Sequence, residues 1–175
     1  DGFVVLSTGW AFDDGEDKYA AILVKTDSEG NQEWLKGYTS SGMNQAFDFD
    51  ATSDGGYILA GHTTGYGVAN WDCLMIKTNA DGELSWQKTF GNPRGYNPEY
   101  IHDECYGIRE LPDGGFIMAG GSGDEYDYSE SGHPAGSSDE WKAYVLRTDD
   151  QGQLLWEAIF DDGPDAGNNA AEYVG

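Results

Sequence analysis

The pattern of Thr78-Asn79-Ala80-Asp81-Gly82-Glu83-Leu84-Ser85-Trp86 occurs three times in the chain and is the strongest indication of its fold. The other two copies run from Thr26 to Trp34 and from Thr148 to Trp156. In every copy Asp or Asn follows the Thr, a Gly stands four positions after the Thr, and the Trp stands eight positions after it. Repetition at a spacing of tens of residues is typical of solenoids, propellers and arrays.

The residues that flank the three copies also recur. An apolar run ending in Lys or Arg precedes each copy, and an aromatic residue (Tyr38, Phe90 or Phe160) lies four positions past each Trp. A second block, Asp54 to Gly61, returns as Asp113 to Gly120, and a truncated form of it opens the chain. Its paired glycines supply the positive φ that tight hairpins demand.

Each unit predicts four short strands and no helix. We expect first strands at 46–51 and 106–111, a second strand at 57–60, a third over the apolar run before Thr78, and a fourth at 84–90. Four antiparallel strands per unit of roughly 50 residues are the signature of a β-propeller blade. The sequence therefore predicts an all-β fold, a β-propeller of four-stranded antiparallel blades, with about three blades in this chain.

The expected organisation follows from these units. Residues 1–54 form a first blade whose first strand is missing or supplied by a tail, and 55–113 form a second blade plus the first strand of the third. The rest of the third blade spans 114–167 with an acidic insert, and 168–175 begins a further first strand. Propellers close with about four to eight blades. We therefore expect other copies of the chain, or the rest of a longer chain, to complete the ring.

The composition is strongly acidic. The chain has 32 Asp plus Glu against 9 Lys plus Arg, a formal net charge of -23. Such a surface repels nucleic acid and anionic membranes, and no apolar run is long enough to span a bilayer. The balance suits an extracellular or cell-surface protein. The chain opens within a repeat and without Met or a signal peptide, so we expect a mature product or an excerpt of a longer chain.

The two blocks resemble the secreted β-propeller repeats of bacterial and archaeal surface proteins, over essentially the whole chain. That resemblance implies a structural or binding role in an exported protein and no fixed catalytic residues. The Trp block is also similar, more loosely, to the propeller repeats of pyrroloquinoline quinone dehydrogenases, where it packs blade on blade. This chain lacks the vicinal cysteine pair of those enzymes.

The recurring Trp34, Trp86 and Trp156 are interpreted as packing residues between neighbouring blades. Cys73 and Cys105 replace alanines of the other copies, in the third strand of one blade and the first strand of the next. Each is typical of a small buried residue, and together they allow a disulfide between blades, which an exported protein permits.

Functional residues are expected on one rim, where the connections differ between copies: 10–18, 62–72 and 121–140 on one set of loops, and 38–45, 91–104 and 161–169 on the other. Calcium is expected at Asp124, Asp127 and Asp139 of the acidic insert, because carboxylates are hard oxygen ligands. A solvated acidic surface is the alternative. Aromatic residues of these loops are candidates for stacking on sugar rings or for packing against a partner: Trp10, Trp71, Tyr96 and Trp141, with Tyr66, Tyr126 and Tyr128.

We expect a non-catalytic structural or binding module that recognises its partner through this rim. The alternatives are a polysaccharide-acting or carbohydrate-binding propeller of a secreted enzyme and, more remotely, a quinone-dependent dehydrogenase. Abundant carboxylates allow a glycosidase-like pair, but none stands out. His62, His102 and His133 lack the spacing of a zinc site, and no Ser lies in a nucleophile elbow.

Overall fold

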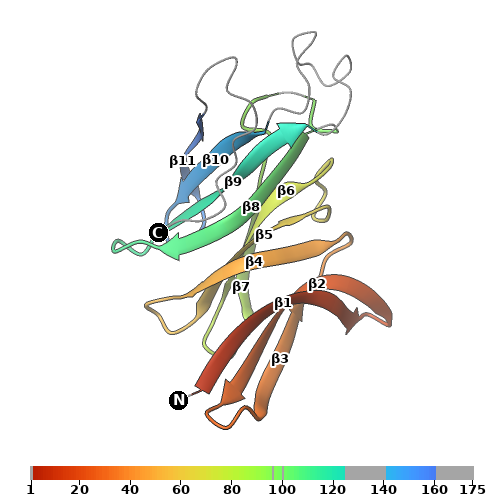
Figure 1. The fold of residues 1–175 in the computed structure, drawn as a ribbon, viewed down its shortest axis with the longest axis vertical. Helices are drawn as coiled ribbons and strands as arrows, with labels where there is room; N and C mark the ends of the chain where they lie inside the picture. Colours follow the sequence, from red (N-terminus) through yellow and green to blue (C-terminus); the bar gives the residue numbers. More distant parts are fainter. Residues whose placement is uncertain (1, 96, 100, 125–140, 161–175) are drawn as a thin grey trace.

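The computed structural model describes residues 2–95, 97–99, 101–124 and 141–160, which form eleven strands in three antiparallel sheets. Figure 1 shows the sheets following one another along the long axis of the molecule. The described residues contain no helix, and so none that is long and apolar enough to cross a membrane. The strands are β1 (Gly2–Asp13), β2 (Glu16–Asp27), β3 (Gln32–Tyr38), β4 (Asn44–Ala51), β5 (Tyr57–Thr63), β6 (Asp72–Thr78), β7 (Leu84–Phe90), β8 (Ile101–Glu110), β9 (Phe116–Asp124), β10 (Lys142–Thr148) and β11 (Leu154–Phe160).

The all-β prediction and its four-stranded antiparallel unit are confirmed by two of the sheets. The middle sheet has the order β4-β5-β6-β7 and the third sheet the order β11-β10-β9-β8. The first sheet contains β1-β2-β3, which are the second to fourth strands of the unit. The predicted further strand at 168–175 lies outside the described residues.

The chemistry of the Gly-Gly turn explains the first repeated block. Gly55 has φ +87°, which only glycine adopts without strain. A Cβ on the next residue, Gly56, would lie 2.0 Å from the carbonyl oxygen of Thr78 on the neighbouring strand. Asp54 Oδ1 accepts the Gly56 N–H at 3.0 Å, and Lys77 Nζ lies 2.8 Å from Asp54 Oδ2. The block therefore specifies a hairpin whose two strands approach closely.

The turn before each Trp is built in the same way in all three copies. Asn79 Oδ1 accepts the backbone N–H groups of Asp81 and Glu83, and the aspartates at the equivalent positions 27 and 149 accept the matching pairs. Gly82 follows with φ +72°. An Asx turn closed by a left-handed glycine explains why the repeat requires Asp or Asn and then Gly.

The middle sheet is buried on both faces. Leu59, Leu74 and Ile76 pack against the first sheet, whereas Ile58, Ala60 and Met75 pack against the third. Alternate residues of a strand point to opposite faces, so two covered faces require a continuous apolar run. This requirement explains the uninterrupted apolar runs of β5 and β6.

Each repeat Trp of the first two sheets contacts the next sheet at its turn glycine. A Cβ on Gly82 would lie 2.9 Å from the ring of Trp34, and a Cβ on Gly152 would lie 2.8 Å from the ring of Trp86. The same indoles lie against the aromatic that follows the next Gly-Gly pair: Trp34 is 6.2 Å from Tyr57, and Trp86 is 5.9 Å from Phe116, between ring centroids. The same Trp contact therefore joins the first sheet to the middle sheet and the middle sheet to the third.

The expectation of a loop over 10–18 was wrong. β1 and β2 continue through this segment as a long hairpin that turns only at Asp14 and Gly15. Their φ values of +51° and +84° match the two-residue turn that Asp-Gly favours. That dipeptide, flanked by Trp10 and Phe12 on an alternating strand, is the signal that sequence reasoning missed. Two strands of the third sheet are also longer than predicted: β8 begins at Ile101, and β9 ends at Asp124.

Candidate functional site

Because the strands of each sheet are antiparallel and follow one another in sequence, successive connections alternate between two edges, each formed by the ends of the strands. The Gly-Gly turns and the Asx turns lie at one edge, and the described variable connections lie at the other: 39–43, 64–71, 91–95 and 97–99. The variable edge contains two features with the chemistry of a site. One is a cleft beside Trp10, and the other is a buried polar cluster around the disulfide.

The cleft has a volume of about 530 Å³ and lies between the β1–β2 hairpin and the connections of the middle sheet. Trp10 is 69% exposed, and its ring meets Tyr19 edge-on at 5.3 Å. The remaining lining is mostly polar. It comprises Glu16, Asp17, Lys18, Ser40, Ser41, Gly42, Met43 and Thr64.

Hydrogen bonds fix both walls of the cleft. On the hairpin side, Asp13 Oδ2 accepts the Thr39 hydroxyl at 2.6 Å and the Lys18 ammonium at 3.0 Å. These two bonds hold the pKa of the Asp13 carboxyl below its ordinary value. On the opposite side, the buried Asn44 Oδ1 accepts the hydroxyls of Ser40 and Thr63 at 2.9 and 2.6 Å. A cleft with fixed walls spends little binding free energy on ordering itself.

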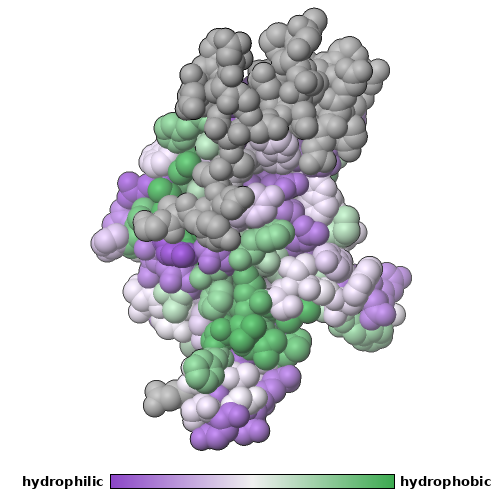
Figure 2. Space-filling view, in the orientation of Figure 1, coloured by the Kyte–Doolittle hydropathy of each residue, from purple (hydrophilic) through white to green (hydrophobic). Residues whose placement is uncertain are grey.

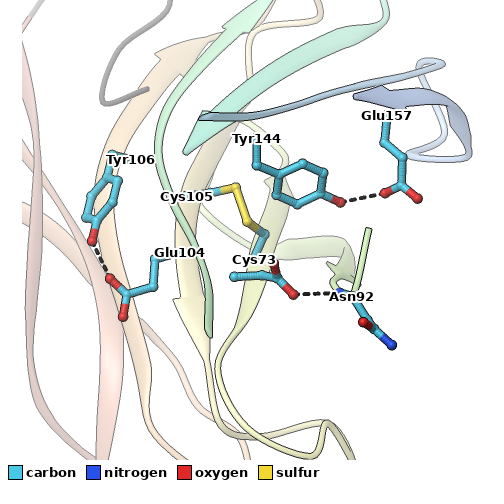
Figure 3. The surroundings of a disulfide bond; sticks show 8 residues. Cys73, Asn92, Glu104, Cys105, Tyr106, Tyr144 and Glu157 are labelled. Atoms are coloured by element: carbon cyan, nitrogen blue, oxygen red, sulfur yellow. Dashed lines mark hydrogen bonds between the residues drawn. A yellow bond between two sulfur atoms is a disulfide. The ribbon is translucent and has the colours of Figure 1, made fainter. Parts of the chain in front are cut away.

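The second feature surrounds the disulfide, which joins Cys73 on β6 to Cys105 on β8 (Figure 3). It links the middle sheet to the third sheet through two fully buried sulfurs. Tyr144 lies beside it and donates its hydroxyl hydrogen to Glu157 at 2.6 Å. The residue pair that the repeat alignment brought together is therefore bonded in the structure.

A buried carboxyl, Asp103, and a half-buried one, Asp72, lie at the link between the middle and third sheets. Asp103 Oδ2 accepts the Asn92 N–H at 2.5 Å, and the Asp103 N–H donates to the Trp71 carbonyl at 2.8 Å. A Cβ on Gly91 would lie 2.4 Å from the Asp72 carboxyl carbon. Asp103 therefore ties together the two variable connections that flank it, and only glycine fits beside Asp72.

Burial raises the pKa of Asp72 to about 6. Burial also raises the pKa of Asp103 to about 7, and the nearby Asp72 carboxylate adds to the shift. Carboxyls that titrate near neutrality are suited to general acid–base catalysis. Asp103, however, is only 1% exposed and is occupied by the backbone. The arrangement fixes the two connections through a carboxyl that is itself not exposed.

The described histidines lie in the same region. His62 Nε2 is 2.7 Å from Gln45 Oε1, and its ring packs among Phe47, Trp71 and Tyr106. Burial lowers the pKa of His62 to about 4, so the ring is neutral at pH 7. His102 lies against Trp141 and 3.5 Å from Glu104. No group of three metal-ligating side chains occurs among the residues that the structure describes, and His133 is outside them.

The predicted stacking residues divide. Trp10 is exposed at the cleft, whereas Trp71 and Trp141 are half-buried, with their rings edge-on to His62 and His102. Trp71 and Trp141 therefore pack within the protein, which was the alternative to stacking on a sugar. Tyr66 is 37% exposed and donates its hydroxyl hydrogen to the Thr39 carbonyl. Tyr96, Tyr126 and Tyr128 lie outside the described residues.

Of the three predicted calcium ligands, one lies in a described strand. Asp124 is the last residue of β9, and Asp127 and Asp139 lie outside the described residues. Calcium at these three carboxylates stays a prediction. The sequence did not predict the cleft, because one wall comes from the hairpin at 10–19 and the other from connections more than twenty residues later in the chain.

Comparison of the sequence with models of known protein families gave no match, and neither did comparison with curated proteins.

Proposed function

We propose that the protein is an extracellular β-propeller module that binds a neutral carbohydrate in the cleft beside Trp10 and performs no catalysis. The exposed indole of Trp10, held in a fixed polar cleft, carries this proposal. A large planar apolar ring stacks on the apolar face of a sugar. The surrounding carboxylates accept hydrogen bonds from the sugar hydroxyls, and the surrounding protein hydroxyls both donate and accept them.

The propeller assignment rests on the way the sheets repeat. Three consecutive antiparallel sheets pack face to face, and the same Trp-to-Gly contact joins each to the next. β4 and β8, the first strands of their units, pack against each other. This is the arrangement expected of successive blades around an axis.

The restriction to neutral sugars follows from charge. Glu16 and Asp17 line the cleft, and the whole chain carries a formal charge of -23. Both repel sulfated and uronic-acid polymers at moderate ionic strength. Export is supported by the disulfide between Cys73 and Cys105, since such bonds persist mainly in oxidising compartments.

A non-catalytic role is supported by the state of two carboxyls at this edge, Asp103 and Asp13. The buried Asp103 is engaged by the backbone of the link. Asp13, beside the cleft, has its pKa lowered by bonds from Thr39 and Lys18 and so stays ionised. A glycosidase acid instead needs a raised pKa at a surface that the sugar reaches.

The test compares Trp10→Ala with Phe12→Ala. Phe12 is 75% exposed on the same hairpin and does not line the cleft, which makes it a matched control. The three proteins are screened on arrays of neutral and sulfated oligosaccharides, and positive ligands are titrated by calorimetry. We expect neutral oligosaccharides to bind, Trp10→Ala to weaken binding about tenfold or more, and Phe12→Ala to leave it unchanged.

Equal binding by wild type and Trp10→Ala would show that the sugar does not bind in the cleft beside Trp10. Prolonged incubation of the bound sugar with wild type, followed by chromatography, tests the absence of catalysis. Shortened products would replace the binding role with the hydrolase alternative.

A further inference from the structure

Each junction between sheets has two complementary faces. The donor face carries the repeat Trp, and the acceptor face carries the turn glycine and the aromatic that follows the Gly-Gly pair. Trp34 meets Gly82 and Tyr57 at the first junction, and Trp86 meets Gly152 and Phe116 at the second. The middle sheet presents one face of each kind, and both are covered.

The first sheet has an uncovered acceptor face. Phe3 and Gly30, which match Tyr57 and Gly82 of the middle sheet, are open: Phe3 is 62% exposed, and a Cβ on Gly30 would meet nothing within 4 Å. Val5 is 50% and Leu35 48% exposed on the same face, which the register places together through Val24. Figure 2 shows hydrophobic residues gathered over β1.

The third sheet has an uncovered donor face. Trp156, which matches Trp34 and Trp86, is 42% exposed, and Phe160 on the same strand is 55% exposed. Trp156 pairs across the sheet with Arg147 and Phe160 with Ala143. These residues lie on the face opposite to Tyr144 and Leu146, which are buried against the middle sheet.

We propose that these two faces bind each other between copies of the chain, head to tail, with Trp156 of one copy on Gly30 and Phe3 of the next. The partner is a second copy because the contact continues an interface that the chain already forms twice. A donor face that fits Gly82 or Gly152 fits an acceptor face with the same left-handed glycine, whose φ is +86° at Gly30.

The new junction differs from the first internal one in its charges. Lys36 pairs with Glu83 across the first junction. The equivalent positions of the proposed junction hold Ala158 on the donor face and Asn31 on the acceptor face. Leu35 is apolar where Gln87 and Glu157 stand in the other sheets. The proposed contact is thus more apolar, which suits association between two copies of a strongly acidic chain.

Head-to-tail contacts are heterologous, so copies close into a ring if the rotation per copy permits and otherwise extend into an open chain. The inference needs only the sheet faces, and it holds whether or not the cleft beside Trp10 binds a sugar.

The experiment measures the mass of the disulfide-bonded chain by sedimentation and light scattering over a range of concentrations. Wild type is compared with Trp156→Ala, which removes the donor ring, and with Val5→Asp, which places a charge on the acceptor face. Phe12→Ala, an exposed aromatic on neither face, is the control. We expect wild type and the control to assemble beyond a monomer, and each face variant to weaken association by about 30-fold or more.

Mixing the two face variants identifies the geometry. Trp156→Ala keeps an intact acceptor face and Val5→Asp an intact donor face, so an equimolar mixture should form a dimer of one copy of each and grow no further. A monomeric wild type, or assembly that Trp156→Ala leaves unchanged, overturns the proposal. Failure of the mixture to pair, with both variants folded by circular dichroism, overturns the head-to-tail geometry.

Discussion

The ring of Trp34 lies so close to the α-carbon of Gly82 that a Cβ there would sit 2.9 Å from two ring atoms. Tyr38, four residues further along the chain, donates its hydroxyl hydrogen to the Gly82 carbonyl at 2.8 Å. The turn glycine of one sheet is thereby fixed by two aromatic side chains of the preceding sheet. Its spacing from the Thr is a requirement of packing as well as of the turn.

The docking role of Gly82 is tested by comparing Gly82→Ala with Gly30→Ala. Both glycines have positive φ, so each alanine costs about 1–2 kcal/mol for a left-handed backbone. Only the alanine at 82 also meets an indole, which adds about 1–3 kcal/mol of overpacking. We expect Gly82→Ala to lower the free energy of unfolding more than Gly30→Ala in urea titrations of dilute protein. Equal losses would show that backbone strain alone fixes this glycine.

Reduction of the disulfide should destabilise the fold. Cys73 and Cys105 are 32 residues apart in sequence, and closing a loop of that size contributes about 3–4 kcal/mol in the chain-entropy account. We expect the midpoint of urea unfolding to fall when a reductant is added. The double variant Cys73→Ala and Cys105→Ala serves as control and should not respond to reductant. A wild-type midpoint that is insensitive to reduction would refute the contribution of the bond.

The stability of the protein should fall as the pH rises from about 4 to about 7 because of Asp103. Its pKa is raised from 3.8 to about 7, so the folded state retains a proton that the unfolded state has already released. The stabilisation is fully present below the unfolded pKa and is lost as the pH rises through the folded one. Asp103→Asn should flatten this slope and stabilise the protein at pH 8, as measured by denaturant unfolding at several pH values.

Asp54 provides a control of opposite sign. Hydrogen bonds from Lys77 and Thr52 lower the pKa of Asp54 to about 2, so its contribution is present at neutral pH and lost as the pH falls from about 4 through 2. Asp54→Asn should therefore reduce stability at pH 7, where it leaves the buried Lys77 ammonium without its anion. For the preceding prediction, a steeper dependence of stability on pH in Asp103→Asn than in wild type would contradict the raised pKa of Asp103.

Salt should strengthen the association of copies. Each copy carries a formal charge of -23, and repulsion between exposed charges is screened within about 10 Å at 0.1 M salt. We expect the dissociation constant to fall between about 20 and 300 mM sodium chloride and then to level off. Because the proposed junction is apolar, sodium chloride should not dissociate the assembly, and dissociation at high salt would indicate an interface held by ion pairs.

The repeated sheet follows from local features of the sequence. The paired glycines fix one hairpin because Gly55 needs a positive φ and Gly56 leaves no room for a Cβ, and Asn79 with Gly82 fixes the next. These are local constraints, carried by residues close together in the chain, and they recur in recognisable form. The strand Leu84–Phe90 was accordingly predicted at its observed bounds.

Which of the variable residues come together in a candidate site depends on how the sheets pack. Trp10 and Trp71 are equally aromatic in sequence, yet one is exposed at a cleft and the other lies on His62. Asp103 is one of 32 acidic residues, and its raised pKa comes first from burial, to which the charge of the nearby Asp72 adds. Exposure and electrostatic environment depend on which segments pack together across long stretches of sequence. The spacing of residues in the sequence therefore specifies the sheets, whereas the packing of one sheet on another sets the exposure and the pKa of each side chain.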